Sequence, residues 1–136
     1  MANILILGAG SMGTAFSVPC SDRNHKVTIV GTHLENNFID KINSSRKHPV
    51  LDCEISKNVS FEKYSNFKDK INKEIDLIAV AVSSKGIEWA SLALSSALTK
   101  SIPILILTKG LSINNNNYEV LAHKMERLLK ENGIKE

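Results

Sequence analysis

The chain has 136 residues, of which 43% are hydrophobic and 23% are charged, and its formal net charge is +3. This balance fits one globular domain with its own core and excludes a disordered chain. No apolar run approaches the roughly 20 residues of a membrane-spanning helix, and no basic stripe with interleaved aromatic residues indicates a nucleic-acid partner. Cys20 and Cys53 are too few for a disulfide framework, and the N-terminus lacks the pattern of a secretory signal, so we expect a cytoplasmic protein.

Four short apolar runs predict strands, at residues 4–7, 27–30, 77–82 and 104–107. None of them alternates with polar residues, which is typical of strands that are covered on both faces of a parallel sheet. A further short strand is expected at residues 59–61.

Helical spacing of apolar residues follows the third and fourth runs. The residues that form these stripes are Ile87, Ala90, Leu94 and Leu98 in one segment, and Val120, Leu121, Met125, Leu128 and Leu129 in the other. We also expect a short helix near residues 35–45 and a charged helical segment over residues 63–73. The alternation predicts an α/β fold, a Rossmann-type doubly wound and mainly parallel sheet with helices on both faces.

A glycine motif connects the first run to a helical segment: residues 8–13 (GAGSMG) match G-x-G-x-x-G in the context that dinucleotide binding requires. Gly8 permits a tight turn, Gly10 lets the backbone approach a pyrophosphate, and Gly13 lets the helix pack closely on the sheet. The free N–H groups of the first helical turn then face the phosphate charge. A P-loop is excluded because Thr14 stands where that motif requires Lys.

The end of the second run bears on the choice between NAD and NADP, because an acidic residue there would bind the ribose hydroxyls. Thr32 and His33 occupy this tip, and neither is acidic. Glu35 is expected at the start of the following helix. Without a carboxylate at the tip a 2′-phosphate is not repelled, so the sequence permits NADP as well as NAD.

Ligands in an open α/β sheet lie beyond the carboxyl ends of the strands. Lys109 follows the fourth run, where its ammonium group is placed to contact a substrate or to stabilise an oxyanion. Lys85 follows the third run and is interpreted as an exposed lysine.

Several other residues have a structural interpretation. Pro19 is expected to bend or end the first helix, and the four asparagines at 114–117 to form a solvated loop. We expect Trp89 to pack at the boundary of sheet and helix and His48 to be a loop residue. There is no H-E-x-x-H or C-x-x-C pattern, so no metal site is predicted.

Four stretches in order resemble glycerol-3-phosphate dehydrogenases: residues 8–15 (GAGSMGTA), 42–49 (INSSRKHP), 79–84 (AVAVSS) and 108–111 (TKGL). Residues 17–19 (SVP) make the chain most similar to archaeal-type members. The resemblance covers essentially the whole chain but only the N-terminal, cofactor-binding half of the family's proteins. It therefore implies that residues 1–136 are an NAD(P)-binding domain that lacks the family's helical C-terminal substrate domain.

The resemblance also implies a reaction, the transfer of a hydride between NAD(P)H and dihydroxyacetone phosphate, which gives sn-glycerol 3-phosphate. By position, Ser11 and Met12 would line the pyrophosphate, Thr32 and His33 the adenosine ribose, and Lys109 the nicotinamide and the substrate as the catalytic residue. Many family members have Arg at the position of Thr32. The expected partner is the small-molecule substrate, with neither nucleic acid nor an integral membrane segment involved, and a homodimer is compatible with these expectations.

Two alternatives stay open at this point. One is the cofactor domain of another two-domain dehydrogenase, such as a ketopantoate-reductase-like protein. The other is a non-catalytic nucleotide-sensing module, which uses the same glycine loop but usually carries an acidic residue at the tip of the second strand.

Overall fold

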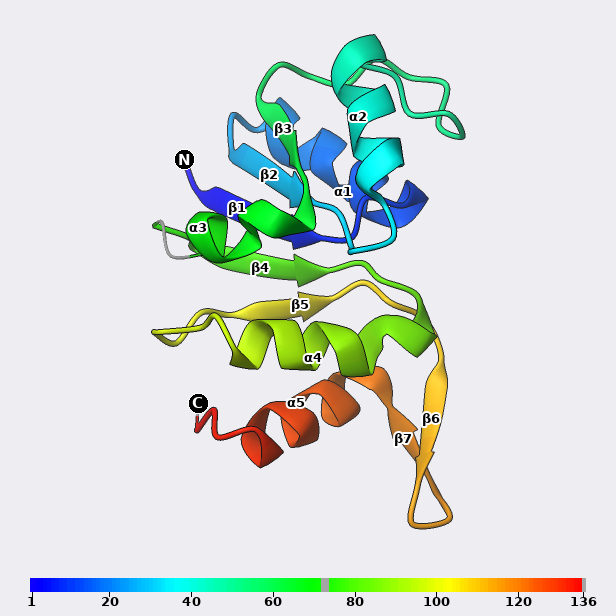
Figure 1. The fold of residues 1–136 in the computed structure, drawn as a ribbon, viewed down its shortest axis with the longest axis vertical. Helices are drawn as coiled ribbons and strands as arrows, with labels where there is room; N and C mark the ends of the chain where they lie inside the picture. The colour runs from blue at the N-terminus through cyan, green and yellow to red at the C-terminus, as the bar shows by residue number, and fades with distance from the viewer. Residues whose placement is uncertain (72–73, 136) are drawn as a thin grey trace.

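Five short strands form one parallel sheet with β1 at its centre, in the order β3-β2-β1-β4-β5. They are β1 (Asn3–Leu7), β2 (Lys26–Val30), β3 (Val59–Glu62), β4 (Leu77–Val80) and β5 (Ile104–Ile106). Figure 1 shows this sheet in a computed structural model that describes residues 1–71 and 74–135. Leu7 is in register with Val30 on one side and Val80 on the other, so the three central strands end at one edge.

Helices cover both faces of the sheet, which confirms the predicted doubly wound arrangement. The helices are α1 (Ser11–Asp22), α2 (Asn36–Ser45), α3 (Phe67–Ile71), α4 (Ile87–Ser95) and α5 (Leu121–Glu131), with short 3₁₀ turns η1 (Tyr64–Asn66) and η2 (Ser84–Gly86). Successive residues of a strand point to opposite faces. Ile4 and Ile6 therefore pack with α1 and α2, while Leu5 and Leu7 pack with α3, α4 and α5.

The sheet differs from the prediction at its two later strands. β4 ends at Val80 rather than at residue 82. β5 is the edge strand of the described sheet and is not covered on both faces, since Leu105 is 38% exposed. A continuous apolar run places apolar side chains on both faces of a strand, but it does not reveal whether the strand lies at the centre of the sheet or at its edge.

The helical segments agree with the prediction apart from their ends. Leu98 lies past the end of α4 and still packs against the core. The segment expected over 63–73 divides into η1 and α3, and residues 72–73 lie outside the described part of the chain. Across residues 1–71 and 74–135, no helix is both long enough and apolar enough to cross a bilayer.

Pro19 does not end the first helix, because α1 continues through it to Asp22. Proline removes one backbone N–H and costs stability in a helix interior. Here the residues that follow compensate: Cys20 and Ser21 are buried against the sheet, and the N–H of Arg23 donates to the carbonyl of Pro19 at 3.3 Å. Tertiary packing of the last turn thus holds a helix that local propensity would end.

Of the asparagines expected to form a solvated loop, Asn115 and Asn116 form the exposed turn of a β-hairpin, whereas Asn114 and Asn117 belong to its strands. β6 (Leu111–Asn114) and β7 (Asn117–Val120) pair antiparallel, and Figure 1 shows them projecting from the body of the molecule. Asn115 and Asn116 have φ of 48° and 64°, the left-handed pair that a two-residue type I′ turn requires and that Asn tolerates. Val120 consequently belongs to β7 and is 45% exposed, so its assignment to the stripe of the last helix is wrong.

Candidate functional site

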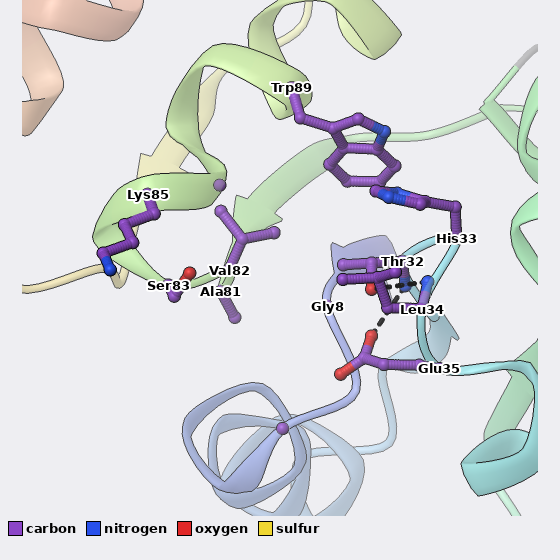
Figure 2. A pocket seen from close by; sticks show the side chains of 12 residues that line it. Gly8, Thr32, His33, Leu34, Glu35, Ala81, Val82, Ser83, Lys85 and Trp89 are labelled. Carbon is purple, nitrogen blue, oxygen red and sulfur yellow. Dashed lines mark hydrogen bonds between the residues drawn. The ribbon is translucent and has the colours of Figure 1, made fainter.

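A cavity of about 510 Å³ lies beyond the carboxyl ends of β1, β2 and β4 (Figure 2). This is where an open α/β sheet binds ligands, and the volume falls within the usual range for small-molecule sites. Four residues singled out from the sequence line it, Gly8, Gly10, Thr32 and His33. The other lining residues are Leu34, Glu35, Ala81, Val82, Ser83, Lys85, Gly86 and Trp89.

The glycine loop is shaped by close backbone packing. Gly8 has a φ of +110°, and its N–H donates to the carbonyl of Val30 at 2.8 Å. A Cβ at Gly8 would lie 2.6 Å from the carbonyl oxygen of Ala81, and one at Gly13 would lie 2.5 Å from the carbonyl oxygen of Gly8. In contrast, a Cβ at Gly10 would meet nothing within 4 Å. Gly8 and Gly13 are therefore needed for packing, whereas Gly10 faces open space.

Helix α1 begins beside that space with its first turn uncapped. Gly10 is the N-cap residue, no side chain caps this end within the described residues, and the first turn carries no acidic group. The first backbone bond of the helix runs from the N–H of Thr14 to the carbonyl of Gly10, at 3.1 Å. Ser11 and Met12 stand at this end, both exposed. The unpaired N–H groups and the helix dipole make this end suited to an anion.

The tip of β2 carries a carboxylate, contrary to the sequence interpretation. Glu35 directly precedes α2, as expected, but its side chain turns back to the strand. Its Oε2 accepts hydrogen bonds from the N–H of Thr32 at 2.6 Å and from the N–H of Ala9 at 3.2 Å. The premise that no carboxylate stands at this tip is therefore wrong, because a side chain from three residues further on reaches it.

An aromatic wall closes one side of the cavity. The rings of His33 and Trp89 lie 5.1 Å apart, and Trp89 lies 4.9 Å from Tyr64. Trp89 packs on the core as expected, but it also lines the cavity, a role that sequence reasoning missed. The available signal was its place one turn into the helix that follows a strand tip. Lys85, interpreted as a plain exposed lysine, is exposed yet lines the opposite side (Figure 2).

Lys109 lies outside this cavity, on a smaller neighbouring one of about 250 Å³. Met12 and Thr108 line the smaller cavity too, and it shares the stretch 81–83 with the larger one, so the two adjoin. The hydroxyl of Thr108 donates to the carbonyl of Val82 at 2.7 Å, which fixes the backbone next to Lys109. The Lys109 side chain itself is exposed.

His48 is a buried loop residue, only 3% exposed, close to the glycine loop. Its Nδ1 accepts from the N–H of Val50 at 3.1 Å, and its ring meets the ring of Phe38 edge-on at 5.2 Å. Burial lowers the pKa of His48, and the backbone of Ala9 partly opposes this shift. A neutral ring with Nδ1 as acceptor suits a packing role under the glycine loop.

Comparison with known sequences relates the chain to one family. A profile of the family described as NAD-dependent glycerol-3-phosphate dehydrogenase N-terminus matches residues 3–135. The chain is 29% identical over 128 residues to a glycerol-3-phosphate dehydrogenase (NAD(P)+) of Exiguobacterium sp., covering 93% of this chain and 37% of that protein. It is 28% identical over 125 residues to an NADP(+)-dependent glycerol-3-phosphate dehydrogenase of Archaeoglobus fulgidus, covering 92% and 36%.

A solved structure shares the fold. Plasmodium falciparum glycerol-3-phosphate dehydrogenase superposes with a TM-score of 0.77 at 20% identity, over 94% of this chain and 38% of that one. The chain thus spans little more than a third of the proteins it matches, rather than the half that the sequence had suggested.

Proposed function

The chain belongs to the NAD-dependent glycerol-3-phosphate dehydrogenase family, whose N-terminal region it matches, and we propose that it binds NAD(H) or NADP(H) for hydride transfer to dihydroxyacetone phosphate. The observation that carries the proposal is the uncapped start of α1 next to the open face of Gly10, at the mouth of the larger cavity. A pyrophosphate fits there because it supplies the charge that the helix end lacks, and because no side chain fills the approach.

The residues around the cavity suit the parts of a dinucleotide. We assign the backbone N–H groups of Ser11 and Met12 to the pyrophosphate, and Thr32 and His33 to the adenosine ribose. His33 and Trp89 together form an apolar, aromatic wall against which an adenine ring can stack. These assignments extend the positions predicted from the sequence by adding Trp89.

Lys109 is proposed as the catalytic residue. Its ammonium group borders the smaller cavity, which continues from the larger one past Ala81 and Val82. The bound nicotinamide would supply the hydride. As the carbonyl oxygen of the substrate gains negative charge, Lys109 would stabilise that charge by a hydrogen bond and by its own positive charge. Met12, from the start of α1, lines the same cavity.

We further propose that residues 1–136 form one NAD(P)-binding domain and that the full reaction requires more of the protein than this chain. The covered fraction of the relatives, 36–37%, supports this division. A second wall over the smaller cavity would exclude water and hold the substrate phosphate, which the described residues near Lys109 do not enclose.

A cytoplasmic location is supported by the two unpaired cysteines. The homodimer stays a prediction, which light scattering tests.

The sole tryptophan provides the test of cofactor binding, because Trp89 lines the cavity. Titration with NADH should quench its fluorescence to saturation, with energy transfer to the reduced nicotinamide. N-acetyltryptophanamide, titrated in parallel, corrects for absorption by NADH. If the folded protein shows no saturable change up to millimolar NADH or NADPH, the proposed function is wrong.

A further inference from the structure

Among the described residues that line the larger cavity, Glu35 is the only acidic one. The strand tips hold its carboxylate in place, because the N–H groups of Thr32 and Ala9 both donate to Oε2. Its other oxygen, Oε1, has no hydrogen-bond partner among the described residues. Figure 2 shows the carboxylate turned from the start of α2 toward the glycine loop. A fixed, charged acceptor therefore stands where β1 and β2 end, with one oxygen still available.

The neighbouring backbone lets Glu35 reach this place. Gly31 separates β2 from the tip, and a Cβ there would lie 2.9 Å from Cγ1 of Ile39 and 3.3 Å from Cβ of Glu35. The absence of a side chain at Gly31 lets the first turn of α2 approach the strand. Glu35 can then span the gap between two parallel strands and satisfy an N–H group on each side.

We propose that Glu35 makes this site select NAD(H) over NADP(H), an inference that rests on the proposed function. In Rossmann-type sites a carboxylate at the end of the second strand accepts a hydrogen bond from the ribose 2′-hydroxyl. Oε1 is available for that bond. A 2′-phosphate at the same position would instead bring a second negative charge against the carboxylate.

Among the described residues that line the cavity, Lys85 is the one Lys or Arg, and it lies on the opposite side from Thr32 and Glu35. No cation of the cavity wall therefore offsets this repulsion at the tip. Family membership leaves the choice of cofactor open, since the relatives include one named as NADP(+)-dependent. The carboxylate charge at the β2 tip therefore determines which cofactor this chain prefers.

Paired titrations with NADH and NADPH, followed by Trp89 fluorescence, test the inference. The unmodified chain should bind NADH at least about tenfold more tightly than NADPH. Glu35→Gln keeps an acceptor oxygen for the two backbone N–H groups but removes the charge, and should bring the two affinities within about threefold, mainly by tightening NADPH. Glu126→Gln makes the same change of net charge on the exposed side of α5, and should leave the ratio within about twofold.

Each other outcome overturns a specific claim. Equal affinities, or a preference for NADPH, in the unmodified chain would refute selection by Glu35 even if the variant failed to fold. If the ratio of the NADH and NADPH affinities is unchanged in a folded Glu35→Gln protein, the carboxylate only stabilises the glycine loop and does not select between the cofactors. If both cofactors bind, the proposed function stands whichever ratio is found, whereas binding of neither would overturn the proposed function and with it this inference.

Discussion

The glycine loop and the segment after β5 both lie at the carboxyl edge of the sheet, yet they are built in opposite ways. Around the loop the backbone is fixed by buried contacts: Gly8 donates to Val30, and Ala81 blocks any side chain at Gly8. After β5, Lys109 is exposed, and the hairpin that follows presents exposed apolar side chains on one face. These are Leu111, Ile113, Tyr118 and Val120, which are 45% to 81% exposed.

This difference indicates which atoms hold each part of the proposed site in shape. The proposed pyrophosphate region is shaped by backbone atoms, so its form is already present in this chain. The proposed substrate region depends on one long side chain next to a single well-held residue, Thr108. Substitutions in the first region should therefore affect folding or cofactor binding, and substitutions in the second should affect turnover with little effect on stability.

The largest effect is expected for Gly8→Ala. The new Cβ would lie 2.6 Å from a backbone oxygen in a left-handed conformation, which should lower the free energy of unfolding by about 3 kcal/mol or more. Gly133→Ala is the matched control, because Gly133 also has a positive φ but open space around it, and about 1 kcal/mol is expected there. Urea unfolding measures both. Equal losses would show that the contact with Ala81 is not what constrains the loop.

Gly10→Val should abolish dinucleotide binding while the chain stays folded. A Cβ at this position meets nothing within 4 Å, so the cost to stability should stay below about 1 kcal/mol. The valine side chain would occupy the approach of the pyrophosphate, and the affinity for NADH should fall at least about 100-fold, or 2.7 kcal/mol. Calorimetric titration measures this, and an unchanged affinity would remove the glycine loop from the site.

Lys109→Ala should reduce turnover by about 100-fold in the protein that carries both domains, because a positive charge next to the developing oxyanion is lost. Its free energy of unfolding should change by less than about 0.5 kcal/mol, since the side chain is exposed. Reduction of dihydroxyacetone phosphate, followed by NADH absorbance, measures the effect. Lys100→Ala, at an exposed lysine that lines neither cavity, serves as the comparison. Near-normal turnover of Lys109→Ala would exclude Lys109 from catalysis.

The smallest effect is expected for the pH dependence of stability, through the ion pair between Arg127 and the hairpin residue Glu119. Arg127 holds Glu119 with Nε on one carboxylate oxygen and a second nitrogen on the other, both at 3.0 Å, and this hydrogen bonding lowers the pKa of Glu119 below its ordinary value of 4.5. The contribution to stability is complete above that ordinary value and is lost as pH falls through the lowered one. Thermal unfolding should therefore be more acid-sensitive below pH 4.5 in the unmodified chain than in Glu119→Gln. Identical pH profiles would contradict this.

Much of the fold was predictable because buried apolar runs and helical stripes extend over many residues. The hairpin was not, although Asn115 and Asn116 are residues that tolerate the left-handed turn it needs. Helix α1 was misjudged at Pro19 because tertiary packing outweighs a local penalty. At the site, the glycine loop was predictable from its spacing together with its place between a predicted strand and a helical segment. Glu35 was missed because its function depends on where its side chain points, and residue order does not reveal that.

The central position of β1 has a consequence for the order in which the molecule can assemble. β1 is synthesised before the other strands of the sheet, but one of its two neighbours, β4, comes more than 70 residues later. Ala81, which backs both Gly8 and Gly13, follows β4 directly. The glycine loop therefore cannot take its final shape until β4 and Ala81 have been synthesised, so a segment made early must wait for a distant one to complete it.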